Sequence, residues 1–256
     1  MLPIVEVPPL LRSALIPLFE GHRRDRAFID CVLEGHFGTA RADKVSDPTV
    51  ARLDCGPFTA LAGAPTSQAA EALVRCAPID WVTPETGEWR ALLERTFVGR
   101  IRAIPFVTFS SATLDVAVLE RHTRSVAEGY ELRRLDAALA ERLVEDMKKE
   151  WLLESYRSLD DFLRRGVGYV AVHEEHVVAS ATSAVTSSGA IDIDIETAAA
   201  HRRMGLATAV GAALALECLV RGIDPVWLAS NETSCRLAEK LGYTRVDRYE
   251  TFEIAE

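Results

Sequence analysis

No stretch of this sequence is long and apolar enough to cross a membrane. The apolar segments Leu214–Leu216 and Cys218–Val220 are separated by Glu217 and end at Arg221, whereas a membrane-spanning helix needs about 20 apolar residues. Residues 1–11 contain three prolines and a glutamate, where a secretory signal would have a basic start and an apolar run. We therefore expect a cytoplasmic protein with no membrane partner.

Cysteine is scarce and scattered. The five cysteines are odd in number and form no C-x-x-C pair; they are Cys31, Cys55, Cys76, Cys218 and Cys235. This pattern excludes a disulfide framework and a zinc ribbon, and it favours reduced thiols. The two histidines of His173-Glu174-Glu175-His176 have no third ligand close by in the sequence, so we interpret them as a polar turn and expect no metal.

Basic residues are outnumbered. The chain has 29 Lys and Arg against 38 Asp and Glu, a net charge of −9, and residues 127–256 alone carry −8. Proteins that bind nucleic acids need Lys- and Arg-rich faces, so we expect no nucleic-acid partner. An acidic half would attract a cationic small molecule, but ordinary solubility explains the same charge equally well.

The length and composition predict a packed protein of one large domain or two ordinary ones, and the order of expected elements favours two α/β domains. The chain has 256 residues, of which 48 % are hydrophobic and 26 % charged, enough for two domains of about 100–150 residues. Residues 1–126 form the predicted smaller α/β domain, a cap, substrate or partner domain, and the sequence shows no internal repeat. We expect helices over 10–19, 26–33 and 67–76, and strands over 39–43, 51–55, 58–62 and 100–109, the last at an edge or bulge because of Pro105.

Residues 127–256 predict a mixed, mostly antiparallel sheet flanked by helices. Expected strands cover 130–135, 168–172, 177–183, 190–197, 225–228 and 243–254. Expected helices cover Leu139–Trp151, Ser158–Arg165, Gly205–Arg221 and Glu232–Leu241.

A short motif between a strand and the longest helix carries the chemistry. The strand Ile191–Thr197 alternates apolar and acidic residues and is followed by Arg202-x-x-Gly205-x-Ala207. The first amides of a helix have no partner within the helix, and small residues let a pyrophosphate approach them. Arg202 and Arg203 would add charge-assisted hydrogen bonds. The motif is weak alone and gains meaning only from its place before the long helix.

This arrangement resembles the acyl-CoA pyrophosphate loop of the GNAT N-acetyltransferase superfamily. Asn231 through Tyr243 resembles that superfamily's last motif, and the order of elements from residue 127 resembles its fold. More narrowly, Ile191–Thr197, Glu217-Cys218-Leu219 and residues 237–243 resemble a bacterial subgroup that includes zwittermicin A resistance-type acetyltransferases. Val32-Leu33-Glu34-Gly35 shares that subgroup's pattern in the first half.

The resemblance implies acetyl-CoA as the cosubstrate and assigns residues to it. The strand splays from its neighbour, so that its last backbone groups pair with the pantetheine arm, the loop amides hold the pyrophosphate, and Asn231 contacts the CoA arm. The implied binding residues are Ile195, Thr197, Arg202, Arg203, Met204, Gly205, Leu206, Ala207, Thr208, Asn231 and Ser234.

The resemblance does not assign the catalytic residues, because this sequence differs from the family pattern at the positions of the acid and of the base. The tyrosine that relatives use to protonate the thiolate is replaced by Ala238, so this role is vacant or moved to Tyr243 or Tyr249. The positions where relatives place a base on the strand are Ile191 and Ile193.

Three carboxylates on the opposite strand face are the alternative base candidates. An amine with a pKa of about 10 must lose a proton before it attacks the thioester. Asp192, Asp194 and Glu196 either line a wet cleft, pair with arginines of the first half, or face solvent. Glu196 is our first choice because it is nearest the thioester end.

The expected function is acetyl-CoA-dependent N-acetylation of a primary amine on a small cationic molecule, similar to an antibiotic or a polyamine. The alternative is a catalytically weak CoA-binding sensor or protein-interaction module. We further hypothesise an acceptor pocket between residues 1–126 and the second half, floored by the three acids. A homodimer is left open.

Overall fold

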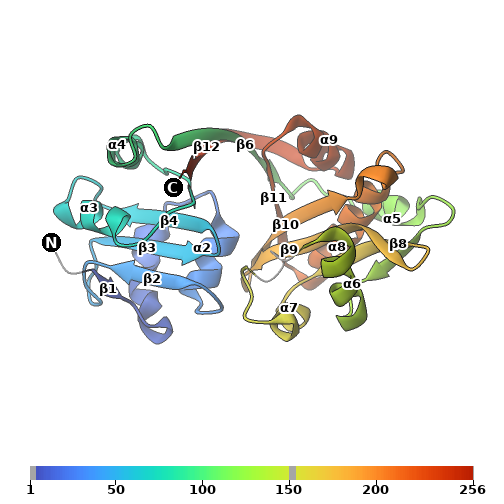
Figure 1. Ribbon diagram of the computed structural model, residues 1–256, viewed down its shortest axis with the longest axis horizontal. Coiled ribbons are helices and arrows are strands. Elements are labelled where there is room, and N and C mark those ends of the chain that lie inside the picture. Colours follow the sequence, from blue (N-terminus) through green and yellow to red (C-terminus); the bar gives the residue numbers. More distant parts are fainter. Residues whose placement is uncertain (1–3, 150–153, 256) are drawn as a thin grey trace. The chain divides into compact units, whose positions relative to one another are not determined.

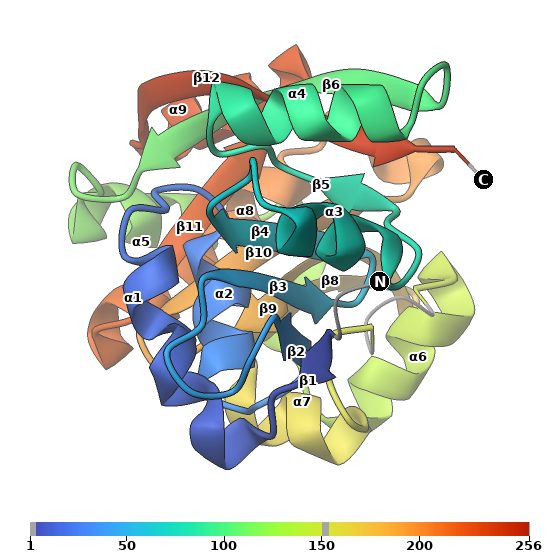
Figure 2. The same ribbon diagram turned by 90° about the vertical axis from the view of Figure 1, so that its left-hand side faces the viewer.

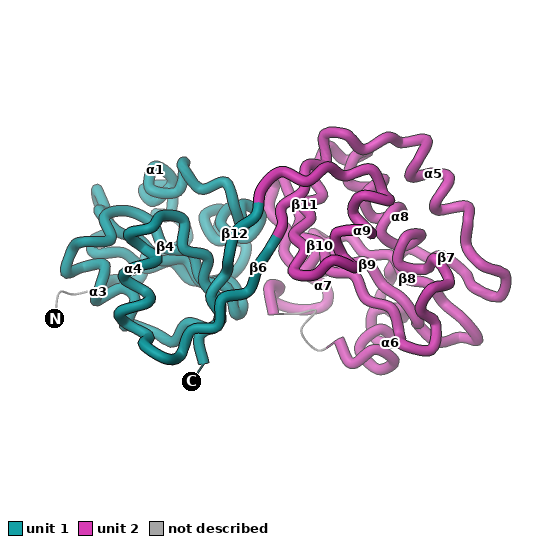
Figure 3. Tube along the Cα trace, turned by 90° about the horizontal axis from the view of Figure 1, so that it is seen from above, with its two compact units in different colours: residues 1–106, 248–256 teal, residues 107–247 magenta. Residues whose placement is uncertain are grey.

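The computed structural model of the protein describes residues 4–149 and 154–255. The chain divides into two compact units: the first runs to Phe106 and includes the end of the chain from Arg248, and the second is Val107–Asp247 (Figure 3). Two strands, β6 (Ile101–Ser110) and β12 (Thr244–Ile254), pass from one unit to the other.

The first unit is a sheet with the strand order β1-β2-β3-β4-β5-β12 (Figure 2). All neighbours are antiparallel except β4 and β5, which are parallel. Besides the crossing strands, its elements are β1 (Val5–Glu6), η1 (Pro9–Leu15), α1 (Ile16–Phe19), α2 (Arg26–Leu33), β2 (Thr39–Ala42), β3 (Val50–Cys55), β4 (Phe58–Gly63), α3 (Gln68–Arg75), β5 (Trp81–Val82) and α4 (Gly87–Thr96). Leu73 of α3, Leu92 of α4 and Phe252 of β12 pack together in one hydrophobic core.

The second unit has the strand order β7-β8-β9-β10-β11-β6 (Figure 1). Its only parallel pair among the described strands is β10 with β11. Its further elements are α5 (Val116–Arg124), β7 (Glu131–Arg134), α6 (Ala137–Met147), α7 (Leu159–Arg165), β8 (Gly168–His173), β9 (His176–Thr186), β10 (Ala190–Thr197), η3 (Ala199–His201), α8 (Leu206–Arg221), β11 (Asp224–Ala229) and α9 (Glu232–Leu241). In the described ranges no helix combines the length and apolarity that a bilayer crossing needs.

Successive side chains along a strand of this sheet pack against helices on opposite faces. Val170 packs in one core with Leu143 of α6 and Phe162 of α7. Ala171, the next residue, packs with Val210 of α8 in another core. Successive strand residues point to opposite faces, so α6 and α7 cover one face and α8 covers the other.

The two units repeat one topology. Each runs strand, helical segment, helix, three antiparallel strands, helix, parallel strand, helix, and each sheet ends on a crossing strand, β12 beside β5 and β6 beside β11. The sequence shows no repeat, so the absence of similar residues did not exclude a repeated fold. The same order of helices and strands, each with one apolar face, is enough to specify the same layers.

The predicted elements are mostly present, with several corrections. The helix predicted over Leu139–Trp151 ends at Met147, where Lys148 takes a left-handed φ of 53°; Trp151 lies outside the described residues. Helices α4 and α5 and the short strands β1 and β5 were not predicted. The boundary predicted at residue 126 differs from the observed units, because Leu119 of α5 packs with Ala212 of α8 in the second unit.

Candidate functional site: a cleft where two strands separate

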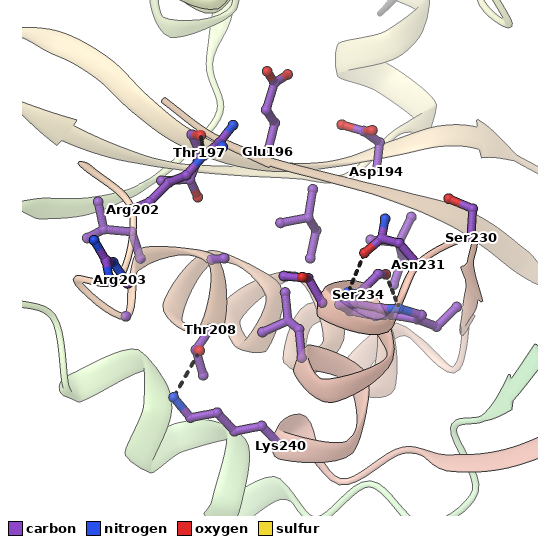
Figure 4. A pocket seen from close by; sticks show the side chains of 18 of the residues that line it. Asp194, Glu196, Thr197, Arg202, Arg203, Thr208, Ser230, Asn231, Ser234 and Lys240 are labelled. Atoms are coloured by element: carbon purple, nitrogen blue, oxygen red, sulfur yellow. Dashed lines mark hydrogen bonds between the residues drawn. The ribbon is translucent and has the colours of Figure 1, made fainter. Parts of the chain in front are cut away.

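A cleft opens where the parallel strands β10 and β11 separate. Their pairing covers Ala190–Asp192 against Asp224–Val226 and goes no further, although β10 continues to Thr197 and β11 to Ala229. The cleft has a volume of about 740 Å³ and is lined by the end of β10, the start of α8, the end of β11 and α9 (Figure 4).

The open edge of β10 offers backbone groups to the cleft. The amide of Ala198 donates to the carbonyl of Val178 on β9, so the alternate residues Ile195 and Thr197 direct their backbone groups to the opposite edge, where β11 has left. The Thr197 carbonyl accepts a hydrogen bond of 3.1 Å from Arg202 Nε. An extended ligand can pair with such an edge as an added strand.

The loop before α8 has the geometry of an anion site. Arg203 has a φ of 65° and Gly205, the residue that precedes the helix, has a φ of 80°. Left-handed residues that alternate with other conformations turn successive N–H groups into one concavity, and the dipole of α8 adds partial positive charge. In the described part of the chain no side chain caps this helix start. The helix predicted from Gly205 therefore begins one residue later, with Gly205 as its cap.

Two cationic side chains of the loop and one of α9 line the same cleft. Arg202 and Arg203 were predicted, whereas Lys240 was not. Lys240 Nζ donates to Thr208 Oγ1 at 3.2 Å, which places an ammonium group beside the first turn of α8. The signal for Lys240 was its place in the Lys-Leu-Gly-Tyr end of the last motif. Of the expected CoA-binding residues only Met204 does not line the cleft, and it is 46 % exposed.

Asn231 and Ser234 are held by hydrogen bonds at the start of α9. Asn231 Oδ1 accepts from the Ser234 amide at 2.9 Å, and Trp227 Nε1 donates to Ser234 Oγ at 3.1 Å (Figure 4). Because the serine oxygen accepts from the indole, its hydroxyl proton is directed elsewhere, and the Asn231 Nδ2 group is likewise a donor. Both side chains line the cleft.

The structure separates the three acids of β10. Asp194 and Glu196 line the cleft and Asp192 does not; the pairing with β9 is interrupted by a bulge between Asp192 and Ile193. Figure 4 shows the Asp194 and Glu196 carboxylates on the side of β10 away from Thr208.

The partner of these acids is a lysine that sequence reasoning missed. Lys149 follows α6 and is 0 % exposed, with Nζ 2.5 Å from Asp194 Oδ2 and 3.6 Å from Glu196 Oε2. Of the three alternatives for these acids, the cleft holds for Asp194 and Glu196, and the ion-pair partner that the structure describes for them is a lysine of the second unit and not an arginine of the first half. Burial raises the pKa of Asp194, and Lys149 acts in the opposite direction. Nothing local marks Lys149, because it is 45 residues from Asp194.

Neither tyrosine considered as the thiolate's acid lines the cleft. The Tyr243 hydroxyl is buried and donates to the Pro225 carbonyl at 3.1 Å, and burial raises its pKa well above the usual range. Tyr249 stacks on Phe106 in the first unit. Ser234 is a hydroxyl that does line the cleft.

The sequence profile of the GNAT acetyltransferase family matches residues 16–252. A GCN5-related N-acetyltransferase-like protein from Streptococcus suis 89/1591 has a similar crystal structure, with a TM-score of 0.84, 29 % identity, and coverage of 96 % of this chain and 98 % of that one.

Two further similarities are more distant or partial. A tandem GNAT protein from the clavulanic acid biosynthesis pathway shares the fold, with a TM-score of 0.65, 14 % identity, and coverage of 98 % of this chain and 97 % of that one. An uncharacterized N-acetyltransferase, YdfB of Bacillus subtilis (strain 168), is 29 % identical over 131 residues, 50 % of each protein. The chain thus spans about half the length of this curated relative.

Proposed function

Because this chain belongs to the GNAT acetyltransferase family, we propose that it transfers an acetyl group from acetyl-CoA to a primary amine, with the cosubstrate in the cleft between β10 and β11. The observation that carries the proposal is that one cleft joins an open strand edge to an anion-binding helix start. A CoA molecule has an extended amide-containing arm and a pyrophosphate, and these two features suit that pair of surfaces.

The residues present fit the cosubstrate along the cleft. Ile195 and Thr197 offer backbone groups to the pantetheine arm, because the Ala198 amide bonds to β9 and the alternate residues face the open edge. The amides of residues 203–208 and the side chains of Arg202, Arg203 and Lys240 would hold the phosphates. Asn231 Nδ2 is a further donor toward the arm.

Bound acetyl-CoA supplies the thioester carbonyl that the amine attacks. Glu196 or Asp194 would take one proton of the incoming ammonium, and the nitrogen lone pair would form the new C–N bond as the C–S electron pair leaves with the thiolate. The second proton lost by the nitrogen would end on that thiolate. A backbone N–H at the open edge of β10 stabilises the oxyanion. The Ser234 hydroxyl would donate a hydrogen bond to the departing thiolate, in place of the tyrosine that relatives carry where this chain has Ala238.

Several finer expectations belong to the same proposal. The net charge of −9 and the two acids in the cleft support a small cationic acceptor, similar to an antibiotic or a polyamine. The motif Ile191–Thr197 supports placement in the zwittermicin A resistance-type subgroup. A cytoplasmic location and the absence of a nucleic-acid partner stay predictions from the sequence.

The test is amine-dependent release of free thiol from acetyl-CoA over a broad panel of primary amines. We expect thiol release to depend on the amine, and Glu196→Gln to lower it with CoA affinity unchanged. Saturable CoA binding with no amine-dependent release across the panel would favour the alternative, a CoA-binding sensor that has lost turnover.

A further inference from the structure

A polar strip lies on the face of the second sheet that α6 and α7 cover. In the antiparallel register Thr182 pairs with Asp194 and Ser180 pairs with Glu196. Directly opposed residues of neighbouring strands point to the same face, so two hydroxyls and two carboxylates lie together.

The two hydroxyls of this strip are buried without a hydrogen-bond partner in the described residues. Ser180 and Thr182 are both 0 % exposed, and neither Ser180 Oγ nor Thr182 Oγ1 has a partner there. Leaving a buried hydroxyl unsatisfied costs free energy that a valine or alanine would avoid. The strip is therefore more polar than packing requires, as expected of a surface that meets a polar ligand or its waters.

The charges of the strip do not balance. Lys149 has no exposed surface, and a buried ammonium is tolerated only beside a carboxylate. Its hydrogen bond to Asp194 is 2.5 Å long, whereas Glu196 is 3.6 Å away and its side chain is 46 % exposed. One cation thus faces two anions, and the more exposed anion is the less tightly held.

Among the residues that the structure describes, the charges that act on this strip can be named. Lys149 and Glu196 are the charged groups that act most on Asp194. β9 contributes only hydroxyls opposite the two acids. On α7, Asp161 and Arg165 pair with each other, and Arg202 of the loop is bonded to the Thr197 carbonyl.

We propose that Lys149 is a positioning residue of the acceptor site, which holds Asp194 as its ionised partner and leaves Glu196 as the carboxylate that receives the acceptor's proton. This assignment rests on the proposed function and deepens it. One proton passes from the acceptor's ammonium group to Glu196, and the freed lone pair forms the C–N bond as the C–S electron pair leaves with the thiolate. The second proton that the nitrogen loses in becoming an amide goes to that thiolate and gives the free thiol. Lys149 donates no proton in this scheme.

The test is a pH titration of the carboxyl groups by carbon-13 NMR, which needs no identified acceptor. Protein labelled at the side-chain carboxyls of Asp and Glu is titrated as wild type, Lys149→Met, and Lys148→Gln, the last a control at the exposed neighbouring lysine. Asp194→Asn assigns the Asp194 signal. In Lys149→Met the Asp194 midpoint should rise by about one to three units, because the cation beside its carboxylate is lost. In Lys148→Gln it should stay.

Two further variants keep the test decisive if Lys149→Met folds poorly. Lys149→Arg retains the charge, so its Asp194 midpoint should stay near that of the wild type. Glu196→Gln should lower the Asp194 midpoint, because Glu196 raises the pKa of Asp194. An unchanged Asp194 midpoint in folded Lys149→Met or in Glu196→Gln would overturn the assignment.

The proposed function and this inference are tested by different measurements. Calorimetric titration with CoA should give the same affinity for the wild type and Lys149→Met, because Lys149 does not line the cosubstrate cleft. If an acceptor is found in the thiol-release panel, the acidic limb of its pH–rate profile should move to higher pH in Lys149→Met and be lost in Glu196→Gln. A limb that persists in Glu196→Gln would remove Glu196 as the proton acceptor.

Discussion

Replacing Gly205 by valine should separate the backbone requirement of the anion loop from ordinary stability. Gly205 has a φ of 80°, and a side chain built on it would meet nothing within 4 Å. The cost of Gly205→Val is therefore conformational and not steric. A left-handed L-residue costs roughly 1–2 kcal/mol, and valine, which is β-branched, is among the least tolerant.

The expected loss of CoA affinity is larger than the loss of stability. A strain of about 1–2 kcal/mol lowers the melting temperature by about 2–8 °C in a protein of this size. If the loop relaxes to a negative φ, at least one amide turns away from the phosphates. A hydrogen bond to a charged group is worth about 1.5–3 kcal/mol, which corresponds to a Kd increase of about 10- to 150-fold.

A matched control is available at the other end of α8. Gly222 has a φ of 69° and nothing within 4 Å of an added side chain, and it does not line the cleft. Gly222→Val should lower the melting temperature by a similar amount and leave the Kd for CoA unchanged. Calorimetry measures the Kd for CoA of both variants, and thermal melts measure their loss of stability. Equal CoA affinities in the two folded variants would refute the role of the loop.

Three other substitutions test charges and caps. Asp161→Asn should cost about 3 kcal/mol at pH 7, because Arg165 and Arg164 bind this buried carboxylate and lower its pKa. By denaturant titration the deficit should shrink as the pH falls below about 4 toward the depressed folded-state pKa; a constant deficit would contradict this. Asp25→Asn should stabilise the protein by about 3 kcal/mol at pH 7.5, because burial raises the pKa of Asp25 to about 6 and its ionised form opposes folding. That advantage should vanish below pH 4, and a less stable variant at pH 7.5 would refute it. Asn231→Ala should cost about 1 kcal/mol in thermal stability by removing the cap of α9, and should weaken CoA binding, whereas unchanged affinity would limit Asn231 to capping.

Local patterns predicted the elements and the loop well. The bounds of α2 are those of the predicted helix 26–33, since its apolar period and the following turn both lie within a few residues. The motif Arg202-x-x-Gly205-x-Ala207 predicted a loop between a strand and a helix. It did not reveal that Gly205 precedes the helix in a left-handed conformation, because a glycine is compatible with either position.

Features that depend on tertiary contacts were not predictable. The ion pair of Lys149 with Asp194 joins the end of one helix to a strand 45 residues away, and no spacing rule connects them. Alternation correctly placed Asp194 and Glu196 on one face, but whether each lined a cleft depended on where β11 stops pairing. The repeat of the two units was invisible because it conserves the order of elements and not the residues.

The most direct test of the cleft as the acetyl-CoA site is amide hydrogen exchange with and without saturating CoA. The first amides of α8, at residues 206–208, have no partner within the helix and no side-chain cap, so they should exchange fast alone. CoA should slow their exchange together with that of Ile195 and Thr197. The start of α3, the equivalent place in the other unit, where the Ser67 side chain already accepts from Ala70, should not change. Bound CoA that leaves the α8 amides unprotected, or that protects α3 instead, would contradict the assignment of the site.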